Sequence, residues 1–249
     1  MRLRILEPVA EGVAKHLATI SRKLRLNVLA STSLIEPKAL IIIGDGTPGD
    51  YCMALVAWAC DGEKMAFITK PKETGIRSVV RHMKETLIGE APHLQQIIIV
   101  IDRDKRGLPD ITEEARKALE EYGFEVLGRQ ELAGGWLKIF SCRWRPRAEI
   151  EITVLVNGLA KDEEYSKDTM DVHVLEAAKH VLKERISDLL RRARDEEDER
   201  GRVDPKTAWR LLAKNKRLQW KVFSFLKEQH SSLLRKLFKQ HHRALERIA

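Results

Sequence analysis

Hydrophobic residues recur along this chain at two spacings, and the spacing changes from segment to segment. Over residues 9–30 the apolar positions fall at roughly helical intervals, which predicts a helix. Short aliphatic runs bounded by turn residues then predict buried strands, the clearest being the five β-branched residues Ile97–Ile101. The strands expected from such runs are residues 40–43, 65–69 and 97–101, and the helices expected after them are residues 51–60, 76–87 and 110–121.

The pattern changes again in the second half of the chain. Further strands are expected at residues 124–127, 136–144 and 149–156, and from Met170 onward only helical periodicity remains. Gly201 interrupts that periodicity, and Asp204-Pro205 restarts it with proline at the first helical position. Residues 194–204 are therefore expected to form a linker or hinge.

The order of these elements predicts the fold class. Alternating strands and helices indicate an α/β fold with a mostly parallel central sheet flanked by helices, followed by an all-helical, basic C-terminal region. A length of 249 residues suits one large or two small domains. We expect an N-terminal helical segment at 1–37, an α/β domain at 38–160 and a helical region at 161–249, with a basic tail from about residue 205.

Composition narrows the class of protein. The chain is 43% hydrophobic and 33% charged, its aliphatic runs are too short to cross a bilayer, and Glu7 and Glu11 stand where a signal peptide would be apolar. We therefore expect a cytoplasmic protein without a membrane partner. The three cysteines have no C-x-x-C spacing, so neither a disulfide framework nor a zinc site is expected. The high content of Glu, Lys and Arg suggests a thermophile, and we expect an archaeal source.

Positive charge is concentrated at the C-terminal end. The formal net charge is +8, yet the segment from Arg210 onward holds eleven Lys and Arg against two Glu, so the preceding residues are close to neutral. Such asymmetry predicts a nucleic-acid or other acidic partner. A basic helical surface that is merely solvated is the alternative interpretation of the same residues. The residues expected to bind nucleic acid are Arg210, Lys214, Lys216, Arg217, Lys221, Arg235, Lys236 and Lys239. Aromatic residues between these cations could stack on bases or could face a hydrophobic core. The same helices could instead bind a second copy of the chain or another protein.

Candidate chemistry lies where two predicted strands end. Ile43 leads into Gly44-Asp45-Gly46-Thr47-Pro48-Gly49-Asp50, and Ile101 leads into Asp102-Arg103-Asp104. Ligands of parallel α/β sheets gather at the carboxyl ends of the strands. Two aspartates at i and i+2 after a buried strand can direct both carboxylates at one Mg²⁺, or Mn²⁺, that also binds phosphate. A solvated turn is the alternative reading of the same residues.

Other enzyme signatures are absent from the sequence. The glycine-rich segment 44–49 lacks the Gly-Lys-Ser/Thr of a P-loop and the G-x-G-x-x-G of a dinucleotide fold. No G-x-S-x-G and no H-E-x-x-H occurs, which argues against the common serine-hydrolase and zinc-hydrolase sites.

The segment Asp102-Arg103-Asp104-Lys105-Arg106-Gly107, after a hydrophobic strand and before a helix, resembles the second motif of the Toprim domain. That family includes the metal-binding domains of topoisomerases and primases and the OLD-type nucleases. Its first motif is a hydrophobic strand ending in Glu-Gly, and here Leu40–Ile43 precedes Gly44-Asp45-Gly46. The resemblance covers about residues 38–130. It implies a Toprim-like sheet, Mg²⁺ at Asp102 and Asp104, and phosphoryl transfer on nucleic acid.

The first motif departs from the family because Gly44 or Asp45 stands where its Glu would be. Asp45, assigned with Asp102 and Asp104 to the catalytic and metal-binding set, is one methylene shorter than that Glu. Three hypotheses follow: a Mg²⁺-dependent nuclease or other phosphoryl-transfer enzyme, a catalytically degenerate Toprim-like binding or assembly module, and a D-x-D nucleotide-sugar transferase. The third would need an acceptor domain for which the chain has little room.

Overall fold

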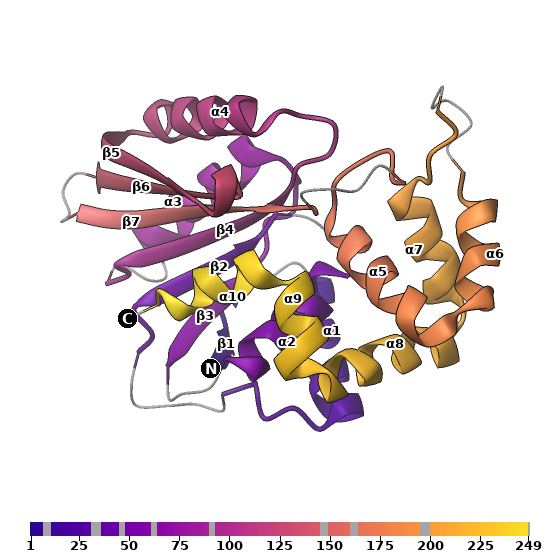
Figure 1. Cartoon of the computed structure of the whole chain (residues 1–249). Helices are drawn as coiled ribbons and strands as arrows, with labels where there is room; N and C mark the ends of the chain where they lie inside the picture. The colour runs from indigo at the N-terminus through magenta and orange to yellow at the C-terminus, as the bar shows by residue number, and fades with distance from the viewer. Residues whose placement is uncertain are drawn as a thin grey trace. The chain divides into compact units, whose positions relative to one another are not determined.

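The computed structural model describes residues 1–6, 11–30, 36–44, 48–60, 64–89, 93–144, 149–159, 164–194 and 200–248. The chain forms two compact units (Figure 1). Unit 1 comprises Met1–Ile101, Arg106–Val156 and Gln240–Ala249, and unit 2 comprises Asp102–Lys105 and Asn157–Lys239. The second aspartate-rich strand end is therefore the point at which the chain first enters unit 2.

Unit 1 is built on a seven-stranded sheet of order β1-β3-β2-β4-β7-β6-β5. The strands are β1 (Arg2–Ile5), β2 (Ala39–Ile43), β3 (Met65–Thr69), β4 (Gln96–Asp102), β5 (Phe124–Leu132), β6 (Leu137–Trp144) and β7 (Glu149–Asn157). The β1–β3, β3–β2 and β2–β4 pairs are parallel, while β5, β6 and β7 pair antiparallel. Backbone bonds from Glu151 N to Gln95 O and from Arg103 N to Asn157 O set β7 parallel to β4. The expected α/β fold with a mostly parallel sheet is confirmed.

Helices bury both faces of the parallel part of the sheet, as uninterrupted aliphatic strands require. The helices of unit 1 are α1 (Glu11–Leu24), α2 (Gly49–Ala59), α3 (Ile76–Gly89) and α4 (Leu108–Glu121), with α10 (Lys239–Glu246) at the end of the chain. Leu40 and Ile42 share a core cluster with apolar residues of α3 and α4. A Cβ on Gly49 would lie 3.3 Å from Ile43 Cγ2, so α2 begins on the opposite face.

Unit 2 is helical, as the periodicity after Met170 predicts. It contains α5 (Met170–Leu182), α6 (Glu184–Arg192), α7 (Pro205–Lys214), α8 (Lys216–Glu228), a π-helical turn at His230–Leu234 and α9 (Arg235–Leu237). Nine of the thirteen residues of α5 are buried, and α6, α7, α8 and α9 all contact it. The apolar sequence of α5 thus makes it the central helix of the unit.

Several elements differ from the sequence-based expectation. The first helix ends at Leu24 rather than near residue 30, because Arg25 takes a left-handed conformation (φ 52°) and Leu29 then bridges to Leu3. The residues before that helix were expected to be helical, but they include the edge strand β1. β5 runs to Leu132, beyond the expected end at residue 127, because β6 pairs with its whole length across a bulge.

The end of the chain returns to unit 1. Arg247 pairs with Glu151 at 2.8 Å, and Lys64 Nζ donates to the backbone oxygen of Ile248. His241 and His242 are buried. The C-terminal region is therefore helical, as expected, but residues 240–248 belong to the α/β unit. None of the helices in the described ranges is long and apolar enough to span a membrane.

Candidate metal and nucleic-acid site

Asp102 is the last residue of β4, and its side chain is fixed on one side by two donors. Asp102 Oδ1 accepts hydrogen bonds from Asn157 Nδ2 at 3.0 Å and from Met170 N at 2.9 Å. Asn157 ends the neighbouring strand β7, and Met170 is the first residue of α5. A carboxylate at a helix N-terminus satisfies an otherwise unpaired N–H and is stabilised by the helix dipole. Asp102, only 3% exposed, is therefore buried in an orientation that leaves Oδ2 for another partner.

Asp104 is held by its backbone. It adopts a left-handed conformation with φ 56°, which aspartate tolerates better than most residues. Its N–H donates to Asp168 O at 2.8 Å, and Asp168 N donates back to Asp104 O at 3.0 Å. Between the two aspartates, Arg103 Nη1 pairs with Asp168 Oδ2 at 2.7 Å. The segment after β4 is thus an ordered part of unit 2 rather than a loosely solvated turn.

The two carboxylates converge on one cation, the ammonium group of Lys206. Lys206 Nζ lies 3.7 Å from Asp102 Oδ2 and 3.5 Å from Asp104 Oδ1. Lys206 is the second residue of α7, which begins after an N-cap made by Asp204. Both carboxylates therefore face one cation, which in this structure is a lysine, and the metal ion that the i, i+2 spacing predicts stays a prediction.

A third carboxyl group in the same unit has a strongly shifted pKa. Asp171 lies in the first turn of α5, and burial raises its pKa from 3.8 to about 7. Thr169 Oγ1 donates to Asp171 Oδ2 at 2.9 Å and the charge of Lys206 acts in the same direction, yet neither outweighs the loss of solvation. Burial also raises the pKa of Asp168, against the opposing charge of Arg103. A carboxyl group that titrates near neutral pH, as Asp171 does, is typical of functional sites.

Only part of the first predicted motif lies within the described residues. Asp45 lies outside the described residues. A Cβ on Gly44 would come within 2.9 Å of Val100 O and 3.0 Å of the Val79 and Ile101 side chains. There is therefore no room for a glutamate side chain at position 44.

Asp50, which opens the helix after that motif, is buried in unit 1. Its Oδ2 lies 2.7 Å from His16 Nδ1, so the two side chains form a hydrogen-bonded pair. Glu149 and Glu151, two further acidic residues of unit 1, pair with Arg143 and Arg247 at the amino end of β7. These two glutamates therefore do not extend the acidic site.

The donor set at Asp102 and Asp104 is small. Within the described ranges, no three His, Cys, Asp or Glu side chains are grouped so that they could hold a metal ion. Asp102 and Asp104 contribute two carboxylates, one oxygen of each within 4 Å of the same ammonium nitrogen. Mg²⁺ commonly takes one or two protein carboxylates and completes its shell with water and phosphate oxygens.

The expected nucleic-acid residues all lie at the surface of unit 2. The eight exposed side chains are Arg210 and Lys214 on α7, Lys216, Arg217 and Lys221 on α8, Arg235 and Lys236 on α9, and Lys239 at the start of α10. The aromatic residues Trp209, Phe223 and Phe238 are buried, so they form core contacts and cannot stack on bases. Trp220 and Phe225 are half-buried.

Lys206 extends this basic surface to the carboxylates. Lys206, Arg210 and Lys214 follow one another at intervals of four and therefore lie on one face of α7. No motif in the sequence singles out Lys206, Asn157 or Asp171. The available signals were weak: Lys206 follows the Asp-Pro helix start, Asn157 ends a strand, and Asp171 falls in the first turn of a helix.

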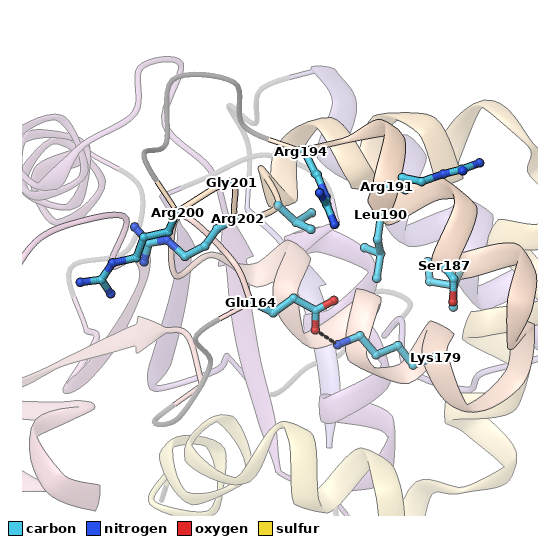
Figure 2. A pocket seen from close by; sticks show the side chains of 11 residues that line it. Glu164, Lys179, Ser187, Leu190, Arg191, Arg194, Arg200, Gly201 and Arg202 are labelled. Carbon is cyan, nitrogen blue, oxygen red and sulfur yellow. Dashed lines mark hydrogen bonds and ion pairs between the residues drawn. The ribbon is translucent and has the colours of Figure 1, made fainter.

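A separate pocket of about 440 Å³ in unit 2 is also lined by basic residues, including Arg194, Arg200 and Arg202. Figure 2 shows the Arg200 and Arg202 side chains extending away from Lys179, which is paired with Glu164. Lys179 also pairs with a second glutamate, Glu176, which lies on α5. The basic groups therefore do not converge in this pocket as the carboxylates do at Lys206.

No protein-family model, no curated protein and no solved structure matches the chain. Its function therefore has to be argued from the residues of the site.

Proposed function

We propose that this chain is a Toprim-like protein that binds nucleic acid and carries out phosphoryl transfer dependent on Mg²⁺ or Mn²⁺. The observation that carries this proposal is the convergence of Asp102 Oδ2 and Asp104 Oδ1 on one cation position, at the end of a central parallel strand. The seven-stranded, mostly parallel sheet and the exposed basic helices support it.

Each residue of the site has a separate task in this proposal. Asp102 is the rigid ligand, because Asn157 and Met170 hold its other oxygen. Asp104 is the more exposed ligand and can adjust to the cation. A divalent cation bound there would neutralise phosphate charge and make the phosphorus more electrophilic. Asp171 can hold a proton on its carboxyl group at neutral pH and release it, because its pKa is about 7.

The basic residues of α7 and α8 bind the phosphate backbone. Arg210, Lys214 and Lys221 are exposed and belong to the same unit as the carboxylates. Phosphate contacts of this kind give affinity without sequence preference and weaken as the salt concentration rises. Asp45 remains the candidate for the carboxylate of the first motif on the strength of the sequence.

A second candidate is a catalytically degenerate Toprim-like module that binds nucleic acid without cleaving it. The observation that favours it is Lys206, whose ammonium group already neutralises the two carboxylates. In this reading the lysine is a permanent structural counter-ion.

Cleavage assays separate the two candidates. Full-length protein is incubated with supercoiled plasmid, single-stranded DNA and RNA, with Mg²⁺, with Mn²⁺ or with a chelator. The enzyme proposal predicts metal-dependent cleavage that Asp104→Asn abolishes. Asp188→Asn, which removes an exposed carboxylate on α6, is the matched control and should cleave normally. Binding without cleavage in every condition would favour the module.

Substitutions are better than truncation for testing the basic helices. Removing the chain after Gly201 would also delete the last ten residues, whose contacts with Lys64 and Glu151 belong to unit 1. Loss of binding by a truncated protein would therefore not separate a missing contact from a damaged fold.

A further inference from the structure

Lys206 stands at an electrostatically unfavourable place in its own helix. It lies in the first turn of α7, where the helix dipole disfavours a positive charge. Its side chain is 46% exposed, whereas that of Asp102 is 3% exposed. The long, exposed lysine side chain, rather than the buried carboxylate of Asp102, is therefore the partner that can move.

Two cations cannot share the space between these carboxylates. The ammonium nitrogen lies 3.5–3.7 Å from both oxygens, so its charge already neutralises the pair of carboxylates that a divalent cation would bind. A divalent cation carries the greater charge but must strip off water to bind. Lysine and metal therefore compete for the same two oxygens.

The displaced ammonium group has an alternative partner close by. One and two turns further along the same face of α7 are Arg210 and Lys214. Arg210 is anchored toward Lys206, since its guanidinium donates to Lys206 O at 3.4 Å and to Thr207 Oγ1 at 3.1 Å. Like charges four residues apart repel one another, and a phosphate bound along this face relieves that repulsion. A phosphate group there lies within reach of Lys206.

We propose that Lys206 exchanges partners: it occupies the cation position between Asp102 and Asp104 in the free protein and moves to a phosphate group when nucleic acid binds. The inference rests on the proposed function, because it assigns Lys206 to that same site. Nucleic acid and metal then bind cooperatively, and by linkage each raises the affinity of the other by the same factor. We expect that factor to be about tenfold, within the usual range for coupled sites.

The test measures metal affinity rather than activity. Mn²⁺ is titrated calorimetrically into the full-length protein, into Lys206→Met and into Lys183→Met, which removes an exposed lysine just before α6. Each titration is repeated with a saturating phosphorothioate oligodeoxynucleotide, which resists cleavage. Without oligonucleotide, Lys206→Met should bind Mn²⁺ about tenfold more tightly than the other two proteins. With oligonucleotide, the unmodified protein and Lys183→Met should gain about tenfold more Mn²⁺ affinity than Lys206→Met, in which only the direct contact between metal and phosphate remains.

The outcomes distinguish this inference from the proposed function. If Asp102→Asn/Asp104→Asn binds Mn²⁺ as the unmodified protein does, the metal site itself is wrong. If only the double variant loses Mn²⁺ and Lys206→Met binds it no more tightly than Lys183→Met, the partner exchange is wrong and the metal site stands. An oligonucleotide that leaves the Mn²⁺ affinity of the unmodified protein unchanged also overturns the exchange. If Lys206→Met binds Mn²⁺ without oligonucleotide and the unmodified protein does not, the partner exchange is supported.

Discussion

At the scale of single residues, the two aspartates of the D-x-D segment differ in burial and in the hydrogen bonds that they accept. Asp102 is buried and accepts two hydrogen bonds from groups that have lost contact with water, whereas Asp104 is 39% exposed on its side chain. A buried donor left without an acceptor costs about 1–3 kcal/mol. The sequence treats these two aspartates as equivalent, and the structure shows that Asp102 also holds the fold together.

Asp102→Ala should therefore lower the free energy of unfolding by about 2 kcal/mol or more, because Asn157 Nδ2 and Met170 N both lose their acceptor. Asp104→Ala should cost only about 1 kcal/mol, chiefly because alanine tolerates a positive φ less well than aspartate. Urea unfolding followed by circular dichroism measures both. Equal losses would show that the hydrogen bonds of Asp102 contribute little.

Two buried groups in unit 2 titrate with opposite effects on stability. Burial lowers the pKa of His173 from 6.5 to about 4, so its contribution to stability grows as the pH rises from 4 to 6.5. Burial raises the pKa of Asp171 from 3.8 to about 7, so the folded protein favours its protonated form and stability falls as the pH rises from 3.8 through 7. Between pH 4 and 6.5 the two contributions largely cancel.

Asp171→Asn should reveal how His173 makes the stability of the protein depend on pH. Asparagine keeps an acceptor for Thr169 Oγ1 but does not titrate. The free energy of unfolding of the variant should then rise with pH by up to about 1.4 kcal/mol per unit between pH 4 and 6.5, relative to the unmodified protein. Urea unfolding over that range gives the slopes. Parallel pH profiles for the two proteins would contradict the raised pKa of Asp171.

At the scale of helices and strands, the aliphatic runs and the start of α7 could be predicted from the sequence, and long-range pairing could not. β3 has the expected bounds, and Asp204 caps α7 by accepting from Thr207 N at 3.0 Å. Gly123, with φ 88°, follows the C-cap of α4 and supplies the left-handed turn that ends the helix. β1 carries only four residues and is recognisable only once β3 is beside it. Lys206 meets the aspartates across about a hundred residues of sequence, a proximity that no local pattern encodes.

The two side-chain caps of unit 2 offer a matched comparison. Asp204 caps α7, and Asn215 caps α8 by accepting from Leu218 N at 3.2 Å. Asp204→Ala and Asn215→Ala should each cost about 1 kcal/mol of stability, the usual value of such a cap. Only Asp204→Ala should also weaken the coupling between Mn²⁺ and nucleic acid, because α7 carries Lys206. Urea unfolding and calorimetry on the same variants separate the two effects.

At the scale of the whole molecule, the charge asymmetry of the sequence corresponds to exposed basic residues on the helices of unit 2. If these residues bind phosphate, the logarithm of the binding constant should fall linearly with the logarithm of salt concentration, by about 0.7–0.9 per phosphate contact. Replacing Arg210, Lys214 and Lys221 by glutamine should reduce that slope by about 2–3. The control replaces three other exposed cations of unit 2, Lys183, Arg185 and Arg192. An equal loss of slope in the control would mean that net charge, rather than the surface of α7 and α8, sets the affinity.

The central claim is that Asp102 and Asp104 form a divalent-cation site, and calorimetric titration of Mg²⁺ and Mn²⁺ in the presence of oligonucleotide tests it most directly. The unmodified protein and Asp188→Asn should bind one ion each. Asp102→Asn/Asp104→Asn, in which asparagine keeps the hydrogen bonds of Asp102, should remain folded and bind none. Binding of the ion by the folded double variant, or no binding by the unmodified protein and by Lys206→Met, would contradict the claim.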